Sequence, residues 1–157
     1  MPVTVSLPAI GSLAPEFTLA STSGQKVTLS SFRGSKNVII AFFPFAFTST
    51  CAAQLCDFST DYAQFANADT VVLPISCDFV QALKAFKAKE QMKVDLLSDV
   101  RRTASAAYGV LMEESFASAR AYFLVDKQGI LRWAFAEAEL GQKRSNAELL
   151  AELAKLG

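Results

Sequence analysis

The feature that most constrains the fold is an apolar run at residues 38–43 (VIIAFF), followed closely by an amphipathic segment. In that segment apolar side chains recur at helical spacing, at Cys51, Leu55, Phe58, Tyr62 and Phe65. A short run rich in β-branched and aromatic residues, followed by a helical repeat, predicts a buried strand that leads into a helix. The sequence therefore predicts an α/β protein with Cys51 at a strand-to-helix junction, where helix N–H groups favour a thiolate.

The rest of the chain extends this unit to strand–helix–strand–helix, then hairpin, then helix. We expect a hairpin at residues 17–19 and 27–29, a strand at 70–76, a helix at about 79–89, an extended piece at 94–97, a helix at about 100–108, a hairpin of strands 121–125 and 130–136, and a capped helix from Ser145 to about 156. This order predicts a thioredoxin-like fold: a central mixed β-sheet flanked by helices, with an N-terminal β-hairpin. The strands at 38–43 and 70–76 should be parallel, so that Cys51 and Cys77 both follow carboxyl ends of the sheet.

Length and charge set limits on organisation and partners. The 157 residues predict a single domain over residues 1–157. Basic and acidic residues both number 15, so no net field attracts nucleic acid or an anionic membrane. No apolar run approaches the roughly 20 residues that span a bilayer, and residues 1–6 lack the pattern of a signal peptide. We therefore expect a cytoplasmic location.

The chain has three cysteines and no histidine. Three cysteines without C-x-x-C spacing predict neither a disulfide framework nor a zinc site, and we expect no metal or other cofactor. The lack of histidine excludes Cys-His and Ser-His-Asp hydrolases and any imidazole base. A nucleophilic Cys51 would therefore depend on a helix N-terminus and on Arg or Lys to stabilise its thiolate.

Pro44, Thr48 and Cys51 form a P-x-x-x-T-x-x-C motif. Residues 42–51 (FFPFAFTSTC) resemble the active-site signature of the peroxiredoxins. Three further segments also resemble that family: residues 14–17 (APEF), 29–37 (LSSFRGSKN), and Arg120 with 123–132 (FLVDKQGILR). The AhpE-like branch is most similar, and the C-x4-C spacing of Cys51 and Cys56 resembles the PrxQ, or bacterioferritin-comigratory, type.

The resemblance implies a thiol-dependent peroxidase that reduces hydrogen peroxide and organic hydroperoxides. Cys51 would be the peroxidatic thiolate, and the Thr48 hydroxyl would hydrogen-bond both that thiolate and the peroxide. Arg120 would keep the thiolate ionised and stabilise charge on the leaving oxygen. Pro44 would shape and shield the pocket. Gln54 departs from the family pattern, because many members carry Glu there.

Three routes could resolve the sulfenic acid that peroxide leaves on Cys51. Cys56 is the first candidate, although five residues of ideal helix separate two Cα atoms by roughly 8–9 Å, and a disulfide needs about 7 Å or less. Resolution by Cys56 therefore predicts local unwinding around residues 50–56. Cys77 is a less favoured candidate at the same sheet edge. An external thiol, from a thioredoxin-like protein or a small molecule, is the third.

Two other functions compete with the peroxidase. A thioredoxin-type thiol–disulfide oxidoreductase shares the fold, but Ala52, Ala53 and Gln54 follow Cys51 where C-x-x-C is expected. A peroxide sensor would use the same reactive cysteine to signal through a partner, and would react slowly. The resemblance implies a homodimer for AhpE-like proteins and often a monomer for PrxQ-like proteins.

Overall fold

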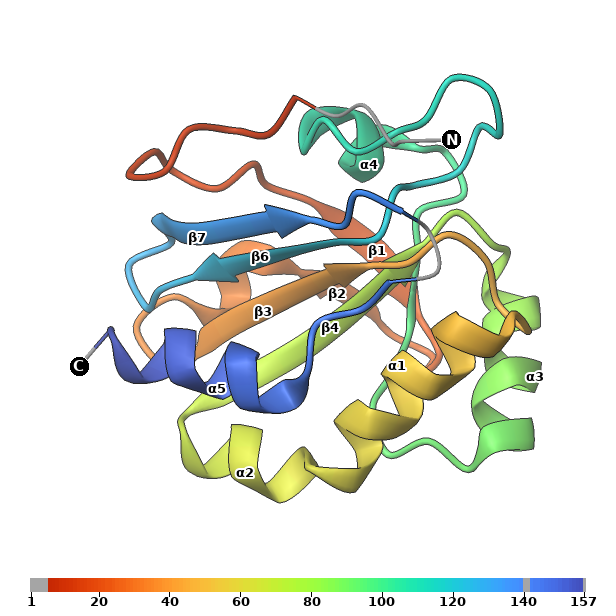
Figure 1. The fold of residues 1–157 in the computed structure, drawn as a ribbon, viewed down its shortest axis with the longest axis horizontal. Coiled ribbons are helices and arrows are strands. Elements are labelled where there is room, and N and C mark those ends of the chain that lie inside the picture. The colour runs from red at the N-terminus through yellow and green to blue at the C-terminus, as the bar shows by residue number, and fades with distance from the viewer. Residues whose placement is uncertain (1–5, 140–141, 157) are drawn as a thin grey trace.

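A computed structural model describes residues 6–139 and 142–156. Its centre is a seven-stranded mixed sheet in the order β2-β1-β5-β4-β3-β6-β7, with helices on both faces (Figure 1). The strands are β1 (Thr18–Ser21), β2 (Lys26–Thr28), β3 (Asn37–Phe42), β4 (Thr70–Ser76), β5 (Leu97–Ser98), β6 (Ala121–Val125) and β7 (Leu131–Ala136). The helices are η1 (Leu29–Phe32), α1 (Ser49–Thr60), α2 (Tyr62–Asn67), α3 (Val80–Glu90), α4 (Thr103–Ala107) and α5 (Asn146–Ala154). The predicted thioredoxin-like fold is confirmed.

The strand β3 lies between two apolar layers. Because successive side chains of a strand point to opposite faces, Ile40 and Phe42 join a cluster that also contains residues of β1 and α4. Ile39 and Ala41 join a second cluster, which contains residues of α1, α2, α3 and α5. Its apolar run is continuous because both faces are covered. Because both faces of β3 are packed, the end of β3 and the first residues after it have a fixed position.

The order of strands brings three strand ends together beside α1. β3 pairs with β4 in parallel and with β6 antiparallel, so Phe42 is level with both Ile75 and Ala121. The predicted parallel pair is confirmed. Residues that follow β3 or β4, and the residue that precedes β6, therefore meet at one edge of the sheet.

The predicted helical stripe from Cys51 to Phe65 is wrong in one respect. The helix ends at Thr60, and α2 begins at Tyr62 after Asp61 departs from helical dihedrals at φ −101° and ψ 19°. Phe65 is buried as predicted, but the side chain of Tyr62 is exposed. The break turns the chain toward β4 and places Tyr62 outside the stripe.

Two shorter elements also differ from their predicted bounds. The helix expected over about 100–108 begins at Thr103, because Arg102 takes a left-handed conformation (φ 63°) and the Asp99 carboxylate accepts the N–H groups of Ala104 and Ser105. The extended piece at 94–97 contributes only the two residues of β5. The N-cap of the predicted capping box of α5 is formed: the Ser145 hydroxyl accepts the backbone N–H of Glu148 at 3.2 Å and donates to the Glu148 carboxylate at 3.3 Å.

Candidate active site

Cys51 lies in the first turn of α1 and its side chain is fully buried. The N-cap residue Thr48 has extended dihedrals, φ −92° and ψ 151°, and the described first turn of α1 contains no acidic residue. The unpaired N–H groups and the positive end of the helix dipole therefore act on the sulfur without a competing carboxylate in that turn. The predicted strand-to-helix position of Cys51 is confirmed.

The loop between β3 and α1 is fixed to the end of β4. Pro44 is buried directly after Phe43, and the backbone N–H of Ala46 donates to the Asp78 carboxylate at 2.9 Å. The Ser76 hydroxyl donates to the same carboxylate oxygen at 2.7 Å. The neighbouring strand thus determines where α1 begins, an anchor that the sequence motif did not reveal.

The phenylalanines of this segment separate into two groups. Phe42 and Phe43 are fully buried core residues, as expected, whereas Phe45 and Phe47 are 42% and 51% exposed. Phe47 has φ 66°, a left-handed value that is uncommon for a bulky residue. Its ring contacts Phe86 of α3 at a centroid distance of 5.0 Å. The exposed pair forms an apolar rim around the start of α1.

Arg120 reaches Cys51 from the next strand. It immediately precedes β6, whose pairing with β3 brings it to the same sheet edge, and it is only 1% exposed. Its Nη2 donates to Cys51 Sγ at 3.0 Å. A buried guanidinium at this distance stabilises a thiolate through charge and a hydrogen bond together. The structure therefore brings Arg120 and Cys51 together, as the resemblance to the peroxiredoxins implies.

Gln54 completes the contact between Arg120 and α1. Three residues after Cys51, it lies on the same side of the helix, and its Oε1 accepts a hydrogen bond from Arg120 Nη1. The side chain is 2% exposed, and among the described residues its Nε2 has no hydrogen-bond partner. A neutral acceptor thus orients the guanidinium without neutralising its charge. The sequence showed the departure from Glu but not this contact.

Thr48 occupies the N-cap position, but its hydroxyl does not cap the helix within the described part of the chain. The hydroxyl instead donates its proton to the Phe45 carbonyl at 3.0 Å. A hydroxyl has one proton to donate, so in this arrangement it cannot also donate to Cys51 or to a peroxide. Rotation about χ1 would be needed to redirect it. Thr48 therefore occupies the N-cap position without forming a cap hydrogen bond within the described part of the chain.

The other two cysteines lie in different surroundings, and all three cysteines are free thiols. Cys56 is half-buried on α1, and its Sγ lies 3.9 Å from Glu90 Oε2. Cys77 is buried after β4, with its Sγ 3.6 Å from the Ser105 hydroxyl. Because Ser105 donates its own proton to Asp99 at 2.7 Å, the Cys77 thiol donates to Ser105. Burial raises the pKa of Cys77, and Asp99 adds to this effect.

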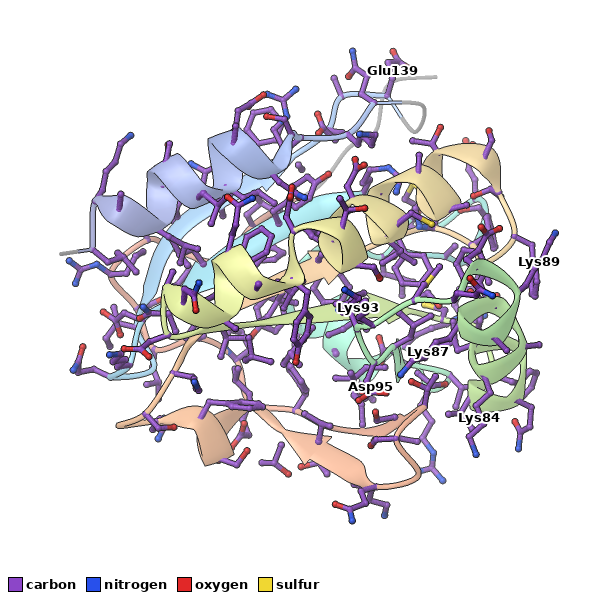
Figure 2. The ribbon with its side chains drawn as sticks, turned by 90° about the horizontal axis from the view of Figure 1, so that it is seen from below. Lys84, Lys87, Lys89, Lys93, Asp95 and Glu139 are labelled. Atoms are coloured by element: carbon purple, nitrogen blue, oxygen red, sulfur yellow. The ribbon has the colours of Figure 1, made fainter. Side chains whose placement is uncertain are left out.

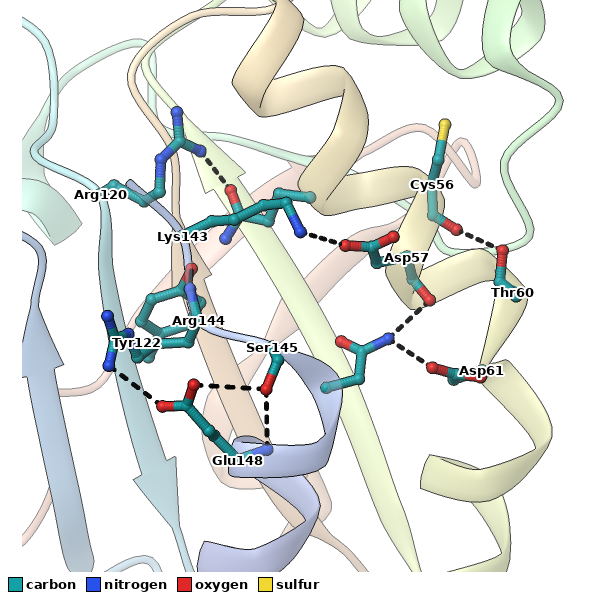
Figure 3. A network of polar contacts seen from close by, with 12 residues as sticks. Cys56, Asp57, Thr60, Asp61, Arg120, Tyr122, Lys143, Arg144, Ser145 and Glu148 are labelled. Atoms are coloured by element: carbon teal, nitrogen blue, oxygen red, sulfur yellow. Dashed lines mark hydrogen bonds and ion pairs between the residues drawn. The ribbon is translucent and has the colours of Figure 1, made fainter. Parts of the chain in front are cut away.

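A polar network holds the second half of α1 (Figure 3). Lys143 Nζ pairs with the Asp57 carboxylate at 2.5 Å. The Asn146 amide donates to the Asp57 carbonyl at 2.7 Å and to the Asp61 carboxylate at 2.8 Å. Figure 3 shows Cys56 on the opposite side of α1 from Arg120. The segment that leads into α5 therefore fixes α1 from Asp57 onward.

The described residues form neither a cluster of metal ligands nor a membrane-spanning helix. Over residues 6–139 and 142–156, no group of three or more Cys, Asp or Glu side chains is placed to hold a metal ion. In the same part of the chain, no helix combines the length and apolar character needed to cross a bilayer.

Known proteins match this chain over most of its length. Residues 10–134 match the model of the AhpC/TSA family. The chain is 38% identical over 127 residues to alkyl hydroperoxide reductase E of Mycobacterium tuberculosis. This alignment covers 80% of this chain and 83% of that protein. It is 32% identical over 160 aligned positions to the chloroplastic 2-Cys peroxiredoxin BAS1 of Hordeum vulgare, covering 96% and 76% of the two chains. The reduced 2-Cys peroxiredoxin of Plasmodium vivax superposes with a TM-score of 0.88 at 28% identity, over 95% of this chain and 82% of that one.

Proposed function

Because the chain belongs to the AhpC/TSA family of peroxiredoxins and is a thiol-dependent peroxidase, we propose that Cys51 is the residue that reduces the peroxide. One observation carries this assignment: the 3.0 Å hydrogen bond from Arg120 to the buried Cys51 sulfur at the start of α1. Hydrogen peroxide and organic hydroperoxides are the proposed substrates. The exposed Phe45 and Phe47 rings offer an apolar surface to an organic group.

In the first step the Cys51 thiolate attacks one peroxide oxygen. A sulfur–oxygen bond forms, the oxygen–oxygen bond breaks, and the leaving oxygen takes a proton to become water or an alcohol. Arg120 is positioned to stabilise the charge that develops on the leaving oxygen. The Thr48 hydroxyl, turned from the Phe45 carbonyl, would donate to the peroxide. Pro44 forms part of the pocket wall, and because proline has no backbone N–H it does not compete for hydrogen bonds with the peroxide.

Cys56 is the proposed resolving residue in the second step. Both cysteines lie within the intact helix α1, where their Cα atoms are roughly 8–9 Å apart, so the first turns must unwind before a disulfide forms. Cys77 is a poorer candidate, because it is buried and already donates to Ser105. Resolution by an external thiol remains the alternative outcome.

The polar contacts around Asp57 favour unwinding of only the first half of α1. Lys143 and Asn146 hold Asp57, and Asn146 also holds Asp61, so the second half of α1 has partners outside the helix. The first half, from Ser49 to Cys56, is the part that must move. We expect the helix to unwind up to Cys56 and to stay folded from Asp57 onward.

A reducing thiol completes the cycle of this peroxidase. We propose a thioredoxin-like protein or a small thiol as that reductant, since either can reach a disulfide in an unwound segment. A homodimer and a cytoplasmic location are also proposed. Size-exclusion chromatography with light scattering would test the dimer directly.

Single Cys→Ser variants at the three cysteine positions test the assignment. Each protein receives one equivalent of hydrogen peroxide, and non-reducing peptide mapping follows. We expect a Cys51–Cys56 link in the parent and loss of fast peroxide consumption only in Cys51→Ser. A persistent sulfenic acid without that link would refute intramolecular resolution. Fast consumption by Cys51→Ser would refute the assignment of Cys51 itself.

A further inference from the structure

The side chain of Cys56 is tied to a neighbouring helix by a carboxylate. Glu90 is the last residue of α3, and its Oε2 accepts the Cys56 thiol at 3.9 Å, a distance within the range for a sulfur donor. Both side chains are half-buried between the two helices. In the folded helix the Cys56 proton therefore faces an acceptor on α3, and its sulfur lies away from Cys51.

Charges near Cys56 also favour the thiol over the thiolate. Burial raises its pKa most, followed by Glu90 on α3 and then by Asp57 on its own helix. Lys143, from the segment before α5, pairs with Asp57 at 2.5 Å and directs its charge there. The negative groups nearest to Cys56 thus come from two elements.

Two of the lysines of this region have partners away from Cys56. Figure 2 shows Lys84, Lys87 and Lys89 projecting from α3 and Lys93 in the following loop. Lys87 pairs with Asp95 at 2.6 Å, and Lys89 lies 5.7 Å from the centre of the Phe47 ring. These contacts lead away from Cys56, so neither Lys87 nor Lys89 offsets the carboxylate of Glu90 at the sulfur.

We propose that Glu90 is a positioning residue that holds Cys56 as a thiol on folded α1 and delays its attack on oxidised Cys51 until the helix unwinds. This inference rests on the proposed role of Cys56 as the resolving residue. When α1 unwinds, Cys56 moves away from α3 and its contact with Glu90 breaks. The Cys56 thiol then loses its proton.

The delayed step is balanced in atoms and electrons. The Cys56 thiolate attacks the sulfur of the Cys51 sulfenic acid, a sulfur–sulfur bond forms, and the sulfur–oxygen bond breaks. Hydroxide leaves and takes up the proton that Cys56 released, giving water. The Cys56 sulfur is oxidised while the Cys51 sulfur is reduced. A longer-lived sulfenic acid is exposed for longer to a second peroxide, which yields the sulfinic acid.

The decisive variant is Glu90→Gln, which keeps the size of the side chain and removes its charge. Rapid acid quench and mass spectrometry give the rate of disulfide formation after one equivalent of hydrogen peroxide. We expect this rate to rise about three- to tenfold near pH 7, and the gain to narrow as the pH rises and the parent thiol ionises. The rate of peroxide consumption should stay at the parent value. The exposed Glu113 provides the control variant Glu113→Gln, which should change neither rate.

Glu90→Ala is the second variant and should accelerate the same step, with folding checked by circular dichroism. An unchanged or slower disulfide step in both variants would overturn the proposal, and slowing would identify Glu90 as a proton acceptor instead.

Alkylation of Cys56 in a Cys51→Ser/Cys77→Ser background separates this proposal from the proposed function. Faster alkylation on loss of Glu90 would support the hold on Cys56 even if the parent formed no disulfide. Equal alkylation rates would refute it.

Discussion

The Nη2 of Arg120 lies 3.0 Å from the sulfur of Cys51, although 69 positions separate the two residues in the chain. The contact exists because Arg120 precedes β6, Cys51 follows β3, and these strands are neighbours. Both side chains are buried, and in the protein interior a charge interaction is stronger than at the surface. With no histidine in the chain, Arg120 and the start of α1 are the two features that we propose stabilise a thiolate at Cys51.

The first prediction concerns the charge and shape of Arg120. Arg120→Met removes the charge and the donors, and should slow peroxide reduction by about 100- to 1000-fold, the usual effect of losing one donor to developing charge. Arg120→Lys keeps the charge without the planar fork and should be intermediate. Stopped-flow fluorescence of Trp133, the only tryptophan, measures the rate. Parent-like kinetics in a folded Arg120→Met protein would contradict this role.

The second prediction concerns Gln54. Its side-chain oxygen accepts a hydrogen bond from Arg120, whereas its side-chain nitrogen has no hydrogen-bond partner among the described residues. Gln54→Glu removes the unpartnered Nε2 and places a carboxylate beside Arg120, so it should raise the free energy of unfolding by about 1–3 kcal/mol. The same carboxylate offsets the charge that Arg120 presents to Cys51. Peroxide reduction should therefore slow by roughly tenfold.

Urea unfolding and stopped-flow kinetics on the same protein measure both effects of Gln54→Glu. The control is Gln54→Leu, which takes the acceptor from Arg120 Nη1 and should lower both stability and rate. A Gln54→Glu protein that is less stable than the parent would contradict the prediction.

The fold and the place of Cys51 could be predicted from the sequence for a physical reason, whereas the pairing of Cys51 with Arg120 was implied by the resemblance to the peroxiredoxins. Buried strands such as β3 produce continuous apolar runs, and a motif directly after such a run has a fixed place in the sheet. The sequence did not predict contacts that join distant segments through single side chains, such as Asp78 with Ala46 or Glu90 with Cys56. An isolated Asp or Glu in sequence is typical of a solvated surface, and only the packing of α1 against its neighbours gives these two a partner.

The third prediction separates the two possible roles of Thr48. Its hydroxyl caps no described N–H group of α1 and bonds instead to the Phe45 carbonyl, so Thr48→Val should change the free energy of unfolding by less than about 1 kcal/mol. Peroxide reduction should nevertheless fall by about 10- to 100-fold, because a donor to the peroxide is lost. Thr48→Ser keeps the hydroxyl and serves as the control. A drop in stability with unchanged kinetics would assign Thr48 a structural role only.

The fourth prediction concerns Tyr122, which supports the segment that holds α1. This buried hydroxyl accepts the backbone N–H of Arg144 at 2.9 Å, and burial raises its pKa to about 12 from 10.0. Because the raised pKa belongs to the folded state, the stability it confers is complete below pH 10 and is lost as the pH rises toward 12. The loss should amount to about 2–3 kcal/mol.

Tyr122→Phe removes both the hydrogen bond and this titration. At neutral pH the variant should be less stable than the parent by about 1 kcal/mol, because the Arg144 N–H loses its acceptor. Between pH 10 and pH 12 the parent should lose more stability than the variant, so the difference between them should shrink and then reverse. Urea unfolding at a series of pH values measures this difference. A difference that stays constant across that range would mean that the Tyr122 hydroxyl ionises equally easily in the folded and unfolded chains.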